Sequence, residues 1–355
     1  MINNQKVFII AEAGVNHNGK LSIAKKLIQA AKDCGADAIK FQNFTADKLA
    51  TKSAKKAPYQ IENTKEIESQ FAMLRKLELK TDDYYKLLNF CKLKKIKFLS
   101  SVFDPESIDF LHKRLKINLI KIPSGEITNY LILHKINLSK YKIILSTGMS
   151  NLKEVVSAIN LIAKKKIYTF NKKKLIIKNT KFLNQIKKKL IIMHCVTDYP
   201  VNDKFANLEC INLMKKTLKL TVGYSDHTKG IIAPLIAVSK GAKVIEKHFT
   251  LNRNMKGPDH AASLNPSEFK KMVNDIRIYE KMLGFGVKKL FACEKVNIKI
   301  ARKSLVALKN IKKGEIFTEK NITTKRPGNG ICASKFKNYL KKKSTRDYKI
   351  DELIK

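Results

Sequence analysis

The chain has 355 residues, 44% of them hydrophobic, which is enough for one large domain and a small one. No uncharged apolar run approaches the ~18 residues of a membrane span, and the apolar stretch near the N-terminus is too short for a signal peptide, so we expect a cytoplasmic protein with no membrane segment. The formal charge of +42 comes mainly from lysines spread along the whole chain. We find no basic patch interleaved with aromatic residues, as proteins that bind single-stranded nucleic acid have. The charge therefore indicates a bias in composition more than a specific nucleic-acid partner.

Short β-rich runs alternate with amphipathic helical segments over most of the chain. Residues 21–35, for example, carry apolar side chains at helical spacing and end on a glycine. Apolar strands that alternate with helices indicate a parallel sheet that is buried on both faces. The expected strands are residues 7–14, 38–44, 97–103, 119–125, 142–148, 190–196, 220–226 and 244–249.

Eight strand–helix units within about 285 residues predict an α/β fold, a (β/α)8 TIM barrel. We therefore expect a barrel domain over residues 1–285, a linker over 286–295 and a small β-rich domain over 296–355, which is too short to hold much core alone. An open doubly wound sheet is the alternative, but no G-x-G-x-x-G and no P-loop follows any strand. The basic stretch 163–190 has no acidic residue, and we expect an enlarged surface helix or loop there.

The six cysteines form no C-x-x-C pair, which speaks against a zinc knuckle or a disulfide framework. We expect most of them to be reduced core residues. Cys195, which follows a histidine at a strand end, is expected to line a site without acting as a nucleophile.

Every predicted strand ends on hydroxyl, lysine, carboxylate or histidine side chains. In a barrel these carboxyl ends meet at one mouth, where active sites gather. Two lysines and three serines at this mouth would make an anion pocket, most naturally for a phosphate. The full set of polar strand-end residues, from which these lysines and serines come, is Glu12, Lys40, Gln42, Ser101, Lys121, Ser124, Glu126, Ser146, His194, Asp198, Tyr199, Ser225, Asp226, His227, Glu246, Lys247 and His248.

Two histidines, His227 and His248, follow neighbouring strands, and Asp226, Glu246 and Asp259 lie near them in the sequence. Parallel strands lie ~4.8 Å apart, so both imidazoles can reach one divalent cation such as Mn²⁺. An ion with two protein ligands keeps open positions, which favours Lewis-acid catalysis over a structural role. The alternative is that both histidines are hydrogen-bonded structural residues.

Eight phrases are spread through nearly the whole chain: "IIAEAGVNHNGKLSIAKKLI", "AIKFQNF", "KIPSGEITN", "ILSTGMS", "HCVTDYP", "GYSDHTKG", "VIEKHFTLNRNMKGPDHAAS" and "KRPGNGI". Taken together and in this order, they resemble the sialic acid synthase family, the phosphoenolpyruvate-dependent nonulosonate synthases. The resemblance implies a (β/α)8 barrel with a C-terminal antifreeze-like (SAF) domain, in a homodimer whose SAF domain caps the partner's barrel by domain swapping.

The resemblance also implies the reaction and the roles of the residues. Phosphoenolpyruvate, water and an N-acetylmannosamine-type aldehyde would give a nine-carbon 2-keto sugar acid and phosphate, with Mn²⁺, Mg²⁺ or Co²⁺ held by His227 and His248. Glu126 would stabilise the positive charge at C2 or relay the proton of the attacking water, and Arg326 would reach the N-acetyl region of the sugar from the partner subunit. Glu12 and Lys121 are implied in catalysis with Glu126; the implied substrate contacts are Lys40, Gln42, Ser101, Ser124, Ser146, Tyr199, Ser225, Asp259 and Arg326.

One departure from the family pattern lies at the third strand, where "SSVF" stands for the usual S-T-P-F. Ser101 replaces the threonine, which keeps the hydroxyl with less restriction of χ1. Val102 replaces the proline, which loosens the loop. We expect a somewhat weaker affinity for phosphoenolpyruvate.

Several readings stay open from the sequence. N-acetylneuraminate synthase is the leading one, with N,N'-diacetyllegionaminate synthase, which would use a 2,4-diacetamido-2,4,6-trideoxy hexose, as the close alternative and pseudaminate synthase behind it. A nucleic-acid-binding protein with an inactive barrel is a remote alternative suggested by the +42 charge. A Schiff-base aldolase that uses Lys40 or Lys121 is suggested by the fold alone.

Overall fold

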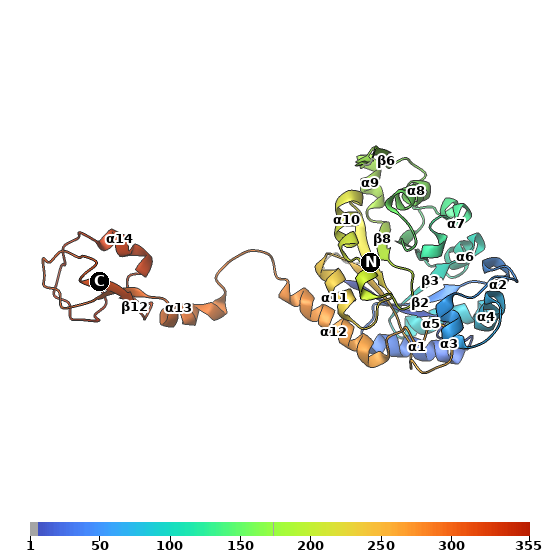
Figure 1. Ribbon diagram of the computed structural model, residues 1–355, viewed down its shortest axis with the longest axis horizontal. Coiled ribbons are helices and arrows are strands. Elements are labelled where there is room, and N and C mark those ends of the chain that lie inside the picture. The colour runs from blue at the N-terminus through green and yellow to red at the C-terminus, as the bar shows by residue number, and fades with distance from the viewer. Residues whose placement is uncertain (1–5, 173) are drawn as a thin grey trace. The chain divides into compact units, whose positions relative to one another are not determined.

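A computed structural model describes residues 6–172 and 174–355. The chain forms two compact units, the first ending at Met282 and the second covering Leu283–Lys355 (Figure 1). We describe each unit by itself. No helix in the described ranges is long and apolar enough to cross a membrane.

Eight parallel strands of the first unit close into a barrel in the order β1-β10-β9-β8-β5-β4-β3-β2. Closure is seen at β1, which pairs with β10 on one side and β2 on the other. The predicted TIM barrel is therefore confirmed. The strands are β1 (Phe8–Gly14), β2 (Ala38–Asn43), β3 (Lys97–Val102), β4 (Leu119–Ile122), β5 (Lys142–Ser146), β8 (Leu190–Cys195), β9 (Thr221–Asp226) and β10 (Val244–His248).

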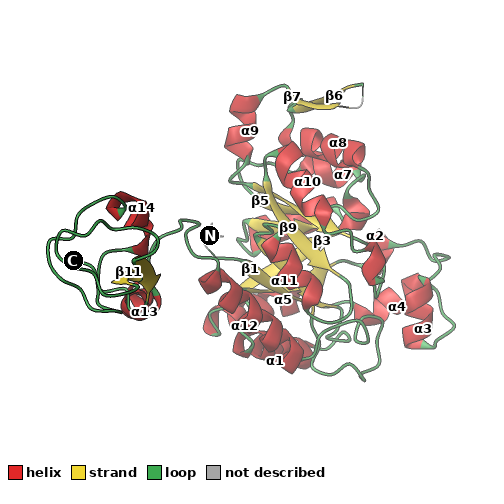
Figure 2. Cartoon of the chain, turned by 60° about the vertical axis from the view of Figure 1, so that its left-hand side comes forward, coloured by secondary structure: helices red, strands yellow, loops and turns green. Residues whose placement is uncertain are grey.

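Helices surround the strands (Figure 2). The α-helices are α1 (Leu21–Asp33), α2 (Ala46–Leu49), α3 (Pro58–Thr64), α4 (Gln70–Leu77), α5 (Thr81–Leu93), α6 (Pro105–Asp109), α7 (Tyr130–Lys135), α8 (Leu152–Ala163), α9 (Thr180–Ile186), α10 (Glu209–Leu218), α11 (Ile232–Ser239) and α12 (Pro266–Met282). Short turns of other helix types are η1 (Phe110–Arg114), η2 (Ser124–Glu126) and η3 (Asp203–Phe205).

The core has two layers because each strand is buried on both faces. All seven residues of β1 are buried, which explains why the strands read as continuous apolar runs. On the outer face α1 packs with Ala24, Leu27, Ile28 and Ala31, the helical spacing seen in the sequence. Inside the barrel a smaller layer is formed by Phe8, Ile10, Ala38, Leu99, Ile144, Met193 and Val244.

The fourth strand is shorter than predicted. β4 ends at Ile122, and the residues that follow turn into η2, where Ser124 and Glu126 lie. The chain leaves the sheet at Pro123, which cannot donate a hydrogen bond to a strand ladder. The polar residues after this strand therefore lie on a turn at the mouth of the barrel.

The structure differs from the enlarged surface helix or loop that we expected over residues 163–190. α8 ends at Ala163, and an antiparallel hairpin of β6 (Tyr168–Asn171) and β7 (Lys174–Ile177) follows, then α9. Figure 2 shows the hairpin beside α9. Tyr168 is fully buried and its hydroxyl donates to the carbonyl of Leu218 at 2.5 Å, so the base of the hairpin belongs to the core.

The second unit contains α13 (Lys295–Ala301), β11 (Ser304–Ala307), β12 (Ile322–Lys325) and α14 (Phe336–Tyr339), with two short turns, η4 (Ala292–Glu294) and η5 (Ala333–Lys335). β11 and β12 pair antiparallel. This unit has a small core of its own, in keeping with its short length. That core consists of Leu305, Ala307, Ile311, Phe317, Ile322, Tyr348 and Ile354.

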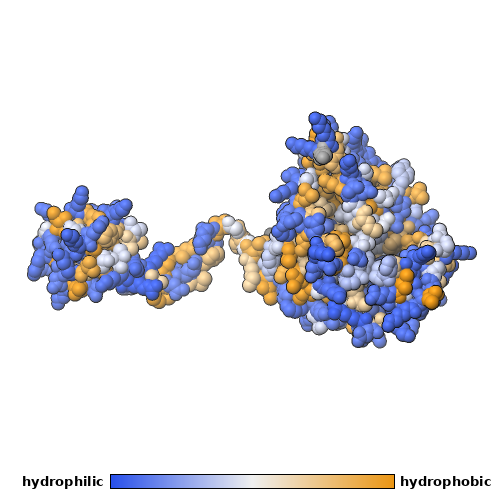
Figure 3. Space-filling view, viewed as in Figure 1, coloured by the Kyte–Doolittle hydropathy of each residue, from blue (hydrophilic) through white to orange (hydrophobic). Residues whose placement is uncertain are grey.

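The segment that begins the second unit exposes apolar side chains. Leu283, Phe285, Val287, Leu290 and Phe291 are each at least half exposed. Figure 3 shows apolar residues along this segment, and a mixture of hydrophilic and apolar residues on the visible face of the barrel.

The cysteines are free, as expected. Only Cys34, Cys91 and Cys195 are buried, however, so half of the six lie outside the core.

Candidate active site

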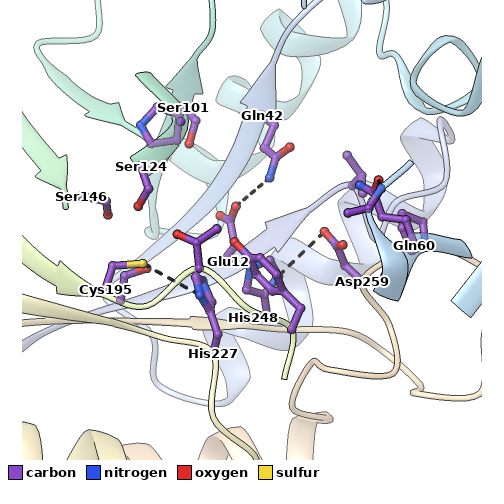
Figure 4. Close-up of a pocket in the computed structure, with 18 of the residues that line it drawn as sticks. Glu12, Gln42, Gln60, Ser101, Ser124, Ser146, Cys195, His227, His248 and Asp259 are labelled. Atoms are coloured by element: carbon purple, nitrogen blue, oxygen red, sulfur yellow. Dashed lines mark hydrogen bonds and ion pairs between the residues drawn. The ribbon is translucent and has the colours of Figure 1, made fainter. Parts of the chain in front are cut away.

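A cavity of about 330 Å³ opens at the carboxyl ends of the barrel strands. Figure 4 shows Ser101, Ser124 and Ser146 toward one end and Gln60 and Asp259 toward the other, with Glu12 and the two histidines between them. Four of the strand-end residues predicted at the mouth, His194, Asp198, Asp226 and Lys247, do not line this cavity. Of the catalytic, substrate and metal residues that the family resemblance implies, all except Glu126 and Arg326 line it. Those that line it are Glu12, Lys40, Gln42, Ser101, Lys121, Ser124, Ser146, Tyr199, Ser225, His227, His248 and Asp259.

The floor of the cavity is a buried charge cluster centred on Glu246. Its Oε1 atom lies 2.7 Å from Lys121 Nζ and 3.6 Å from Lys40 Nζ, and accepts a 3.2 Å hydrogen bond from Ser225. Lys40 also pairs with Glu12 at 2.7 Å and donates to Ser101 at 2.9 Å. Because β2, β4 and β10 each supply one member, closure of the barrel is what assembles the cluster.

Burial gives the members of this cluster different acidities. Although burial opposes it, Lys121 and Lys40 lower the pKa of Glu246 to about 2. Burial raises the pKa of Glu12 to about 7, against the opposing effect of Lys40. Burial also lowers the pKa of Lys121. Glu12 is therefore the carboxyl of this cluster that can exchange a proton near neutral pH.

Oxygen atoms without partners point to a ligand at this floor. Among the described residues, Oε2 of Glu12, Oε2 of Glu246 and the hydroxyls of Ser146 and Thr197 are buried without a hydrogen-bond partner. Buried polar atoms are costly unless they are satisfied. Ser124 accepts a hydrogen bond from the backbone N–H of Gly148 at 3.0 Å.

The two histidines face each other beside Tyr199. The ring centres of His227 and His248 are 5.4 Å apart, and Tyr199 packs 4.2 Å from His227. Nδ1 of His227 lies 2.7 Å from the carbonyl of Val196, so its other nitrogen is free for a ligand. Burial and the neighbouring His227 lower the pKa of His248 well below the usual range, which keeps this imidazole neutral.

This pair fits a divalent cation held by two imidazoles. Ligand bonds of about 2.1 Å place two ring centres about 5 Å apart, close to the observed distance. Nδ1 of His248 is buried without a partner and lies 4.0 Å from Oδ2 of Asp259, whose pKa burial raises to about 6. Within the described ranges no three His, Cys, Asp or Glu side chains are grouped closely enough to hold a metal, so such an ion would keep open positions.

A buried ion pair lies behind the histidines. Nζ of Lys247 lies 2.5 Å from Oδ2 of Asp226 and donates to the carbonyl of Thr228 at 2.5 Å. The other oxygen of Asp226 accepts from Tyr224 and from the backbone N–H of Thr228. Since Asp226 and Lys247 each precede a histidine in the chain, this pair fixes β9 to β10 where the histidines emerge.

Glu126 lies beside the cavity without lining it, although the adjacent Gly125 does. Its Oε2 accepts a hydrogen bond from Asn129 at 2.6 Å, and burial raises its pKa. Arg326 belongs to the second unit, where its exposed side chain donates to the carbonyl of Ala301 at 3.1 Å.

One wall of the cavity was not predicted from the sequence. α3 and α4 lie between β2 and β3 in the chain and contribute Tyr59, Gln60 and Met73. Tyr59 packs against Tyr199 with ring centres 4.9 Å apart. A proline at the first helical position of α3 was the local signal, but it says nothing about which way the helix faces.

The departure "SSVF" preserves the cavity. Ser101 lines it and is held by Lys40, while Val102 is fully buried in the outer core. The proline of the usual pattern is replaced by a core side chain.

A closed parallel barrel with a buried, charged cavity at its strand carboxyl ends defines a TIM-barrel enzyme. The chain belongs to the NeuB family, whose sequence profile matches residues 27–288, and residues 302–355 match the SAF domain. It is 50% identical over 352 residues to N,N'-diacetyllegionaminic acid synthase of Campylobacter jejuni, covering 99% of each chain. It is 42% identical to the Legionella pneumophila protein of the same name, over 94% of this chain and 89% of that one.

Among solved structures, a sialic acid synthetase from Leptospira borgpetersenii is similar, with 31% identity and a TM-score of 0.66. The match covers 83% of this chain and 91% of that one. The expected family is therefore confirmed, and the protein is an enzyme of the synthase class.

Proposed function

We propose that this protein is an N,N'-diacetyllegionaminate synthase. It would condense phosphoenolpyruvate, water and 2,4-diacetamido-2,4,6-trideoxymannose to the nonulosonate and phosphate. The cavity carries this proposal, because it joins a cationic, serine-lined end to an end of aromatic, amide and carboxylate groups. The choice of sugar rests on similarity: relatives named for legionaminate reach 50% and 42% identity, against 31% for the sialic acid synthetase.

Phosphoenolpyruvate is assigned to the end formed by Lys40, Lys121 and the serines. The two ammonium groups share one carboxylate oxygen of Glu246, so the cluster has cationic donors available to an incoming phosphate or carboxylate. Ser101, Ser124, Ser146 and Ser225 add hydroxyl donors around them.

The sugar is assigned to the end formed by Tyr199, Gln42, Gln60 and Asp259. Met73, Leu74 and Leu77 of α4 also line the cavity, and the proposal assigns them to this end as an apolar wall. A 6-deoxy sugar with two acetamido groups presents methyl groups that gain from such a wall, at about 0.8 kcal/mol for each buried carbon. This wall favours the diacetamido sugar.

The reaction forms a bond between C3 of phosphoenolpyruvate and the aldehyde carbon, adds water at C2 and releases phosphate. Glu12, with a pKa of about 7, is placed to move a proton near neutral pH. Glu126 is assigned to the positive charge that develops at C2. A cation on His227 and His248, with Mn²⁺ proposed and Mg²⁺ or Co²⁺ as alternatives, would make the aldehyde more electrophilic.

N-acetylneuraminate synthesis, the first expectation from the sequence, is the second candidate, supported by the sialic acid synthetase structure. The acceptor end of the cavity has amide and hydroxyl partners for N-acetylmannosamine as well. Although burial opposes the shift, Glu12 and Glu246 raise the pKa of Lys40, which argues against Lys40 as the nucleophile of a Schiff-base aldolase, because a cationic lysine is a poor nucleophile. Burial lowers the pKa of Lys121, so the aldolase reading is tested at that lysine.

The deciding experiment is phosphate release from phosphoenolpyruvate by the full-length protein, with each of the two sugars and with Mn²⁺ or EDTA. We expect metal-dependent release with both sugars and a higher kcat/KM with the diacetamido sugar. A preference for N-acetylmannosamine would favour the second candidate, and a borohydride-trapped adduct would support the aldolase.

Variants separate the proposed parts of the site. His227→Ala and His248→Ala should abolish turnover and weaken Mn²⁺ binding measured by calorimetry, whereas Glu126→Gln should abolish turnover with Mn²⁺ binding kept. Full activity of either histidine variant would refute the metal assignment.

We also propose the domain-swapped homodimer, in which Arg326 completes the partner's site. Arg326→Ala and His227→Ala should each be inactive alone. After mixing and subunit exchange, about a quarter of the activity should return, because half of the dimers would carry one intact site. No recovery, with exchange shown by mass spectrometry, would place Arg326 in its own subunit's site.

A further inference from the structure

A second cavity, of about 680 Å³, lies at the opposite end of the barrel from the active site. Its lining includes residues at the amino ends of β3, β4, β5 and β8. The volume falls within the ~300–1,000 Å³ that is usual for small-molecule sites. Neither the proposed reaction nor the comparisons give it a role.

The cavity lies where two neighbouring strands of the barrel, β3 and β4, pair over a short length. β3 and β4 pair at one residue pair, Ser101 with Lys121, within the described part of the chain. The flanking pairs are longer: β2 and β3 pair at six positions from Ala38 to Asn43, and β4 and β5 at four. The amino halves of β3 and β4 therefore diverge, and the cavity lies at this divergence.

Apolar side chains line the interior. Phe98, Leu99 and Leu119 come from the two diverging strands, and Leu88, Ile96, Ile117 and Ile191 surround them. An occupant with an apolar ring or chain would bury this surface, which contributes about 25 cal/mol for each square ångström removed from water.

Lysines supply the charge around this lining. Six line the cavity, and no Asp or Glu does; they are Lys92, Lys97, Lys140, Lys142, Lys188 and Lys189. Lysine is abundant in this chain, so their number alone decides nothing. None of the six has an ion-pair partner among the described residues, as is true of most lysines in this chain, so the proposal depends on their position around the apolar lining.

Two of these lysines are held beside the cavity by other contacts. Lys97 Nζ lies 4.9 Å from the ring centre of Phe8, and Lys189 Nζ donates to the carbonyl of Ser139 at 3.1 Å. These two cations are thus placed next to the apolar lining, within reach of an anionic group on an occupant of the cavity.

We propose that this cavity is a second ligand site, which binds an amphipathic anion: an apolar ring or chain that carries a carboxylate, sulfonate or phosphate. The apolar part lies between the diverging strands and the anionic group contacts the lysines. The site is independent of the assignment of the sugar substrate.

The test uses 8-anilino-1-naphthalenesulfonate as the probe, with fluorescence read on the full-length protein. N-phenyl-1-naphthylamine, which has the aromatic frame without the sulfonate, is the matched neutral probe. We expect saturable binding of the sulfonate at least 10-fold tighter than that of the amine. We also expect no displacement by phosphoenolpyruvate, because the active-site cavity is separate.

Variants locate the site. Lys140 and Lys188 are exposed and outside the active site, so Lys140→Ser/Lys188→Ser should weaken probe binding at least 10-fold with phosphate release unchanged. Ser139→Trp, which places a large ring at the cavity, should also weaken it at least 10-fold. The charge-matched control Lys320→Ser/Lys337→Ser, in the second unit, should change it less than 2-fold.

Three results would each overturn the proposal. One is equal binding of the two probes, which would remove the role of charge. Another is equal loss in the two double-lysine variants, which would show a general field effect. The third is displacement of the probe by phosphoenolpyruvate, which would place it at the active site.

Discussion

The pair formed by Lys247 and Asp226 makes a quantitative prediction about the support behind the histidines. Lys247 is 1% exposed, and Lys247→Met keeps the length of the side chain while it removes the charge. The change leaves Asp226 buried and ionised without its cation. Breaking a buried pair in this way costs about 3–5 kcal/mol. For a unit of this size the loss corresponds to roughly 6–20 °C in Tm.

The double variant tests the reasoning. Burial lowers the pKa of Lys247 even though Asp226 opposes the shift, so the pair does not fully offset its desolvation. Asp226→Asn in the Lys247→Met background removes the orphaned charge and keeps acceptors for Tyr224 and Thr228. We therefore expect the double variant to be more stable than Lys247→Met alone by about 2 kcal/mol or more.

The assay is urea unfolding followed by circular dichroism, with Lys240→Met as the control. Lys240 pairs with Glu209 on the surface, and loss of such a pair costs less than about 1 kcal/mol. The reasoning would be refuted if the double variant were no more stable than Lys247→Met.

Three further predictions concern the cavity, its charge cluster and the hairpin. Gly148→Ala would place a methyl carbon 2.1 Å from Thr197 Oγ1 and 2.7 Å from Ser124 Oγ. Because both side chains line the cavity and would have to move, the KM for phosphoenolpyruvate should rise roughly 10-fold or more. Adding Thr197→Ala should lower this KM in part. Glu246 has a pKa of about 2 in the folded protein against an ordinary 4.5, so its contribution to stability is present above pH 4.5 and is lost as the pH falls toward 2. Glu246→Gln should therefore flatten the pH dependence of the free energy of urea unfolding between pH 4.5 and 2. An unchanged pH dependence would contradict the ion pairs assigned to Glu246. Tyr168→Phe should cost about 1–2 kcal/mol in unfolding free energy with kcat unchanged, since its hydroxyl is bonded far from the cavity; a change in kcat would link the hairpin to the site.

The strands and the mouth of the barrel were predictable because their signals are local. Each strand is an apolar run that breaks into polar residues, as at Lys40 and His227, and a barrel brings such breaks to one mouth. The hairpin was missed although Tyr168, Phe170, Leu175 and Ile177 alternate as strand residues do, because the surrounding lysines suggested a solvated segment.

The remaining features depend on contacts that lie far apart in the chain. Which carboxylate holds Lys40 and Lys121 is decided by closure of the barrel, since Glu246 lies 125 positions from Lys121. The placement of Tyr59 depends on packing against Tyr199, 140 positions away by residue number. Neither relationship leaves a periodic trace in the sequence.

The single residue pair that joins β3 to β4 has a consequence for how the barrel opens. A closed barrel has no free edge, so local unfolding begins at the seam that has the fewest bridging hydrogen bonds. That seam is held at Ser101 and Lys121, both of which line the active-site cavity. A molecule that contacts both residues would hold β3 and β4 together. The amide hydrogens of these strands should therefore exchange with solvent more slowly when phosphoenolpyruvate is bound than when it is absent. Bound phosphoenolpyruvate would thus stabilise the β3–β4 junction against local unfolding.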